Sequence, residues 1–156
     1  MKGNDKVIET LNMLLAEELT AINQYMVHSE MCANWGYGEL HEAIEKRAIT
    51  EMKHAEMHIA RLLFLEGRPV VSKLNELHIG ADVLSQLKDD LGAEQGAVKV
   101  YNAAVKLAVE VGDNGTRAML EGILKDEEDH LDWLETQLDQ IEQIGLQNYL
   151  AQQIEH

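Results

Sequence analysis

The stretch EMKH at residues 51–54 returns in chemical outline 76 positions later, as EEDH at residues 127–130. Each stretch is a glutamate followed three residues later by a histidine, and residues at that spacing share one face of an α-helix. A single pattern of this kind is most often an ordinary pair on a helix surface. Two copies at a long offset indicate a more specific arrangement if their neighbours repeat as well.

The same offset relates further residues on the helical stretches that precede these two. It places Glu18 on Glu94 and Tyr25 on Tyr101, while most other positions differ between the two halves. The repeated feature is therefore a set of functional groups rather than a duplicated sequence. It predicts two equivalent helix pairs, each with one set of ligands, related by a local two-fold axis.

The four glutamates of this repeat fall where the core of the molecule should be. Glu18, for example, lies between Leu15 and Ile22 on one apolar helical stripe, and the other three have similar neighbours. An unpaired charge in such a place is strongly destabilising. We find no lysine or arginine on the same stripe, so we expect two divalent metal ions to supply the positive charge.

The types of ligand narrow the choice of metal. The set offers carboxylate oxygens and one imidazole per metal ion, without a thiolate. Such donors suit iron or manganese better than structural zinc, which more often uses cysteine. The candidate metal ligands are Glu18, Glu51, His54, Glu94, Glu127 and His130.

Composition agrees with a helical protein that attracts cations. Hydrophobic residues make up 46% of the chain but aromatic residues only 4%, and there is one proline, which suits long helices better than a sandwich or barrel. The net charge of −15 argues against nucleic acid and anionic membranes as partners. Cys32 is alone, and we see neither a membrane span nor a signal peptide, so we expect a soluble cytoplasmic protein.

Glycine and proline divide the chain into four long helical stretches and a short tail. Gly92 and Gly96 lie inside the third stretch and suggest places where another backbone packs closely. The predicted helices are residues 5–34, 39–66, 82–111 and 116–144, with a short fifth helix at 146–154.

The join between the second and third stretches, residues 67–81, is long enough to change the topology. Fully extended it would reach roughly 50 Å, whereas a 25-residue helix is only about 38 Å long. This crossover segment can therefore run back along the whole bundle before the third helix starts. We expect it to be ordered by packing of its apolar residues, which are Val70, Val71, Leu74, Leu77 and Ile79.

With these residues in place, the whole chain resembles the bacterioferritins, the haem-binding members of the ferritin family. The resemblance implies a single ferritin-like di-iron domain over residues 1–156, all-α, with a long crossover and a short C-terminal helix. It also implies a homo-oligomeric shell of 24 subunits that stores a ferric mineral and oxidises Fe(II) with O2 or H2O2. The matching segments are AINQY (21–25), EMKH (51–54), FLEG (64–67), DEEDHLDWLETQL (126–138) and GLQNY (145–149).

The resemblance also implies a role for each candidate ligand. Glu18 and His54 would cap one iron ion, and Glu94 and His130 the other. Glu51 and Glu127 would bridge the two ions. Tyr25 is similar to the family tyrosine that forms a hydrogen bond beside the centre.

Met52 is the second position to which the resemblance gives a role. By itself it reads as a methionine that packs at a subunit contact, but bacterioferritins use this methionine to ligate a haem b shared by two subunits. A ferredoxin-type protein is then a possible reductant. The residues expected around the haem are Leu19, Ile22, Asn23, Met26 and Ile49, with Met57 adding to a methionine-rich face.

Some positions depart from the family pattern. Lys46 and Thr50 stand where many relatives carry a histidine and an aspartate that bind a further iron ion on the inner surface, so we expect that site to be absent. His58 stands where some relatives have a tyrosine, although Trp133 remains. Two other functions stay open: a peroxide-scavenging or substrate-oxidising di-metal enzyme, and a haem-carrying electron-transfer protein.

Overall fold

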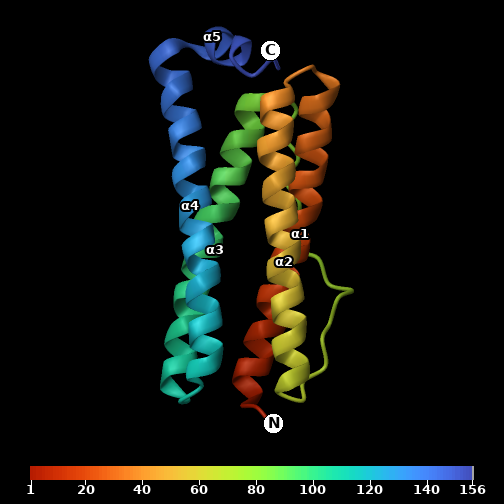
Figure 1. Ribbon diagram of the computed structural model, residues 1–156, viewed down its shortest axis with the longest axis vertical. Coiled ribbons are helices and arrows are strands. Elements are labelled where there is room, and N and C mark those ends of the chain that lie inside the picture. Colours follow the sequence, from red (N-terminus) through yellow and green to blue (C-terminus); the bar gives the residue numbers. More distant parts are fainter. Residues whose placement is uncertain (156) are drawn as a thin grey trace.

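Four long helices and one short helix form the chain, and the computed structural model describes residues 1–155. The long helices lie alongside one another, α1 beside α2 and α3 beside α4, each pair antiparallel (Figure 1). This confirms the predicted all-α bundle with its long crossover and short fifth helix. The helices are α1 (Asp5–Asn34), α2 (Gly38–Phe64), α3 (Val83–Glu110), α4 (Asn114–Ile144) and α5 (Leu146–Ala151).

Local sequence explains where the helices begin and turn. The Asn4 side chain accepts two backbone N–H groups of the first turn of α1, and Asp82 and Ser85 form a reciprocal capping box at the start of α3. The two short turns within the pairs pass through Gly36 and Gly112, whose φ angles are 86° and 76°. A side chain is strained in that region, so glycine suits both turns.

The interior consists of two apolar clusters that lie on either side of a polar layer. One cluster is built around Leu11 and Leu15 of α1 and Leu120 of α4. The other is built around Ile44 of α2 and Leu134 of α4. The predicted ligands lie between these clusters along the helices, so the polar layer is sealed from water at both ends of the bundle.

The crossover segment is ordered, but not by the apolar packing that we expected. Its five apolar side chains are 39–59% exposed, which contradicts the prediction that they pack inward. Backbone N–H groups of the segment instead donate to polar side chains of α1. These hydrogen bonds are Val70 to Asn12 at 2.9 Å, Asn75 to Thr20 at 2.8 Å, His78 to Gln24 at 3.2 Å and Gly80 to His28 at 3.0 Å.

A buried aspartate on α3 ties this row of side chains to the second helix pair. Asp90 Oδ1 accepts a hydrogen bond from Gln24 Nε2 at 2.8 Å and lies 2.9 Å from His28 Nδ1. All three side chains are almost fully buried. Asp90 thereby joins α1, α3 and the crossover segment at one point.

Two smaller features complete the fold. Tyr149 of α5 donates a hydrogen bond to Gln137 Oε1 at 2.6 Å, which holds the short helix across one end of the bundle (Figure 1).

A Cβ atom at Gly92 or Gly96 of α3 would meet nothing within 4 Å, so the prediction that another backbone approaches these glycines closely is wrong. No helix within residues 1–155 combines the length and apolar character needed to cross a membrane.

Replacing Asp90 should loosen the crossover segment. In Asp90→Ala, the buried amide of Gln24 and the imidazole of His28 lose their shared acceptor, and we expect a loss of about 1–3 kcal/mol in the free energy of unfolding. Urea unfolding of the metal-free protein measures this loss, and proteolysis within residues 67–81 should accelerate. Asp139→Ala, at an exposed position of α4, is the matched control. Equal stability of the two variants would contradict this role for Asp90.

Candidate metal centre

The structure brings all six sequence-predicted ligands together in the polar layer. They come from four different helices, and each is at most 8% exposed. α1 contributes Glu18, α2 contributes Glu51 and His54, α3 contributes Glu94, and α4 contributes Glu127 and His130.

One half of the centre is formed around His54. Its Nδ1 atom lies 3.6 Å from Glu18 Oε2, 3.5 Å from Glu51 Oε2 and 3.4 Å from Glu127 Oε1. One donor atom from each of these four residues lies within 4.8 Å of the other three. The outer nitrogen of the ring, Nε2, is 2.8 Å from the Asp126 carboxylate, which orients Nδ1 toward the shared space.

The other half of the centre contains an arginine. His130 Nδ1 lies 2.9 Å from Glu94 Oε1. Close by, the Nη2 nitrogen of Arg47 approaches one oxygen of each of three carboxylates. Its distances are 2.6 Å to Glu51 Oε1, 2.8 Å to Glu127 Oε2 and 3.8 Å to Glu94 Oε2.

Arg47 corrects the expectation that the buried stripe lacks a cation. It is 9% exposed and lies one helical turn before Glu51, on the same face as Ile44. That spacing of four residues was the available signal. The spacing alone did not mark the position as buried, because an arginine is seldom found in a protein interior.

One arginine cannot satisfy the donor atoms that converge here. These atoms could ligate a pair of metal ions, and a set of carboxylate and imidazole donors suits iron. Cys32 lies elsewhere and donates to Gln86. Buried atoms of the centre without a hydrogen-bond partner include Glu18 Oε2, Glu51 Oε1, His54 Nδ1, Glu94 Oε2 and Glu127 Oε1.

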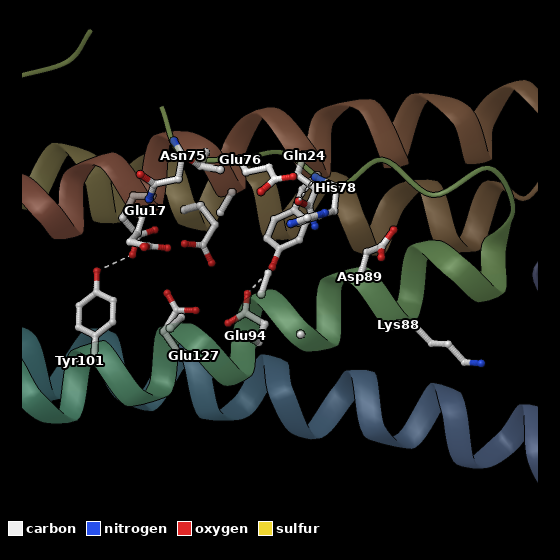
Figure 2. A pocket seen from close by; sticks show the side chains of 18 residues that line it. Glu17, Gln24, Asn75, Glu76, His78, Lys88, Asp89, Glu94, Tyr101 and Glu127 are labelled. Atoms are coloured by element: carbon white, nitrogen blue, oxygen red, sulfur yellow. Dashed lines mark hydrogen bonds between the residues drawn. The ribbon is translucent and has the colours of Figure 1, made fainter. Parts of the chain in front are cut away.

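Two tyrosines cross between the helix pairs to hold the terminal carboxylates. Tyr25 of α1 donates to Glu94 of α3, and Tyr101 of α3 donates to Glu18 of α1. In Figure 2 the dashed line from the Tyr101 hydroxyl marks its hydrogen bond to Glu18. His58 Nε2 lies 2.6 Å from the Tyr101 hydroxyl and must donate to it, because the hydroxyl proton goes to Glu18. Only Tyr25 had been assigned from sequence, although the 76-residue offset indicated Tyr101 equally.

Burial and crowding change the protonation of the ligands. Burial raises the pKa of Glu51 to about 8, and the charge of Glu18 adds to the effect. Burial also raises the pKa of Glu127 to about 9, helped by Glu94. Burial opposes the charged form of His54, but contacts with three carboxylates, first that of Glu127, raise its pKa to about 12. Without metal, these three groups therefore carry protons at neutral pH.

A cavity of about 380 Å³ leads from the surface to the carboxylates. It opens between α1, α3 and the crossover segment, and Glu17, Glu76 and Asp89 lie along it, with Lys88 further out (Figure 2). Gly92 forms part of its wall, where a side chain would narrow the passage. The acidic lining suits the passage of a cation.

Metal binding at this centre should release protons. Because the pKa values of Glu51 and Glu127 are raised, a divalent ion must displace protons that these carboxyls hold at neutral pH, and the affinity should rise between about pH 6 and pH 9. Zn²⁺ titration in weak buffer with an indicator dye measures the release. Glu51→Gln should release fewer protons. An affinity that does not change with pH would contradict the assignment.

Comparison with known proteins agrees with this geometry. The ferritin-like domain of the ferritin family matches residues 8–144. The chain is 43% identical to a bacterioferritin of Rhodobacter capsulatus, over 96% of this chain and 92% of that protein. It is 43% identical to a bacterial ferritin of Neisseria gonorrhoeae, over 99% and 100%, and 40% identical to a bacterioferritin of Mycobacterium avium, over 97% and 96%. The chain therefore belongs to the ferritin family and, within it, to the bacterioferritins.

Proposed function

We propose that the chain oxidises Fe(II) to Fe(III) at an intrasubunit centre made of the six buried ligands. Iron storage with ferroxidase activity is the function of the bacterioferritins, to which the chain belongs. The observation that carries the residue assignment is the convergence of unsatisfied oxygen and nitrogen atoms at the inner end of an acidic cavity. Each substrate ion would reach the centre by that cavity.

The bridging role is proposed for Glu51 and Glu127, because each directs its two oxygens to different halves of the centre. One oxygen of each lies near His54, and the other oxygen lies near Arg47, in the half that holds Glu94. Glu18 and His54 then cap one ion, and Glu94 and His130 cap the other.

The tyrosines and the buried surroundings complete this proposed chemistry. Two Fe(II) ions supply the two electrons that convert O2 and two protons to H2O2, or H2O2 and two protons to water. Tyr25 and Tyr101 keep the terminal carboxylates oriented through their hydroxyl hydrogen bonds. Burial raises the pKa of both tyrosines well above the ordinary value, so they remain neutral donors.

Oligomerisation is a property of the ferritin family, and we propose a cytoplasmic shell of 24 copies in which residues 1–156 act as one domain. The exposed apolar side chains of the crossover segment support burial against another subunit. A ferredoxin-type protein would supply electrons for iron release. Gel filtration with iron analysis tests the shell: a particle of subunit size without mineral would favour the enzymatic or electron-transfer alternatives.

A haem-binding role for Met52 is also proposed. Met52 is 45% exposed and lines a half-open pocket of about 320 Å³ with Ile22, Met26 and Ile49, as expected. A second copy across a two-fold axis would close the pocket over a flat apolar ring. Ser29, Glu30, Glu45 and Ala48 complete the lining.

The lining of this pocket does not include Leu19, Asn23 or Met57, three of the residues expected around the haem. Leu19 packs against the interior cluster, and the Asn23 amide donates to the Leu19 carbonyl. Met57 lines a different groove, with Phe64 and Met119. The methionine-rich face is therefore smaller than expected and centres on Met26 and Met52.

Glu51→Gln and Glu127→Gln should each abolish rapid Fe(II) oxidation while the bundle remains folded. An amide has one acceptor oxygen and no charge, so it cannot bridge two cations. Stopped-flow absorbance measures ferric ion formation, and circular dichroism measures the fold. The control is Glu56→Gln, an exposed position of α2. Rapid oxidation in both bridging variants would refute the assignment.

Met52→Leu should lose haem but retain Fe(II) oxidation, since the ferroxidase ligands are separate from the haem pocket. If two subunits share the haem across a two-fold axis, one substitution would remove the Met52 thioether from both of them at once. The visible spectrum reports haem binding, and reductive iron release should slow. Met57→Leu is the control. A Met52→Leu protein that keeps a bis-methionine haem spectrum would refute the ligand assignment, and normal release without haem would refute only the role in release.

A further inference from the structure

The two halves of the centre are not equivalent, because a guanidinium nitrogen lies in one of them. We propose that Arg47 occupies the second metal position of the metal-free protein, so that the two positions fill in sequence. The first ion binds between Glu18 and His54, and the second must displace Arg47 from the half that holds Glu94. This inference rests on the dinuclear centre proposed above.

The geometry of Arg47 is that of a cation in a metal position. Nη2 lies within 4 Å of the three carboxylate oxygens that a metal ion beside His130 would use. It donates a hydrogen bond to Glu127, but its 2.6 Å approach to Glu51 Oε1 is not a directed hydrogen bond, and that oxygen remains without one. The contact with Glu51 is therefore close but does not satisfy that oxygen.

In the other half, no lysine or arginine among residues 1–155 lies within 4 Å of the Glu18 carboxylate, whose charged neighbour is His54. His54 Nδ1 is 3.4–3.6 Å from its three carboxylate oxygens, too far for short hydrogen bonds. A metal ion can take the place of the proton on His54 without movement of that side chain, whereas Arg47 has to move, and this difference favours the first ion in the half that holds His54. The ligands of the two halves thus correspond by a local two-fold axis, but Arg47 lies in only one of the two halves.

Arg47 can leave its position only by moving. Burial opposes its charge, but Glu51, Glu94 and Glu127 outweigh burial and keep its pKa above the ordinary value, so it stays protonated. A metal ion bound at about 2.0–2.2 Å to the same oxygens would collide with Nη2. The two cations therefore exclude each other from this half of the centre.

The surroundings provide a route for this movement. Nη1 donates to the backbone carbonyl of Asp126 at 3.1 Å, and the Asp126 side chain is half-exposed at the edge of the bundle. Nε is buried without a hydrogen-bond partner, so the side chain is held by its two terminal nitrogens. Turning about the Asp126 contact would carry the charge from the bridging carboxylates toward solvent.

The test is an anaerobic titration of the metal-free protein with Co²⁺, followed by calorimetry and by the visible spectrum of the bound ion. The wild-type protein should bind two ions in separate steps, the second at least about tenfold more weakly. In Arg47→Gln and in Arg47→Met, the second step should tighten by about tenfold or more and approach the first. Arg47→Met keeps a long side chain if Arg47→Gln folds poorly.

The matched control is Arg61→Gln, also on α2. Arg61 is partly buried and pairs with Asp113 at 2.9 Å and with Thr116, away from the centre, so both steps should be unchanged. The inference would be overturned if the wild-type protein bound both Co²⁺ ions with equal affinity, or if the affinity for the second ion were unchanged in both Arg47 variants. Either result would leave the dinuclear centre intact. Failure of the wild-type protein to bind Co²⁺ would overturn both.

Discussion

Four carboxylates buried between two apolar clusters are the constraint on which the rest of this structure depends. Glu18, Glu51, Glu94 and Glu127 are each at most 2% exposed, and water is excluded above and below them. Their charges must be met by protons, by cations or by hydrogen-bond donors. The raised pKa values of Glu51 and Glu127, the buried Arg47 and the metal ions of the proposed centre are alternative ways of meeting this requirement.

The crossover segment leaves the buried carboxylates accessible from the surface of the protein. Because it is held by hydrogen bonds to one row of polar side chains on α1, its position beside α3 is defined without filling the space over the centre. Asp90 secures the same row from α3. The result is a cavity with an acidic lining that ends at the carboxylates, together with an exposed apolar segment available to another subunit.

Arg47 explains how a site built for two divalent ions can be stable before they bind. It places positive charge beside Glu51 and Glu127, and under the proposed order of metal binding it makes one half of the centre harder to fill. The pocket around Met52, proposed above to hold haem, lies on another face of α2, so the two proposed redox sites share a helix without sharing ligands. One helix can serve both because its residues point in several directions around its axis.

The sequence by itself determined the helices, their pairing and the six candidate ligands, because helical periodicity and the 76-residue offset are properties of the chain alone. Periodicity states which face a residue occupies but not what lies opposite. Only the tertiary structure decided that Arg47 reaches carboxylates from three helices, and that polar rather than apolar contacts hold the crossover segment. Apart from the Arg47–Glu51 pair within α2, these contacts join residues distant in sequence, and their geometry exists only after the helices have packed.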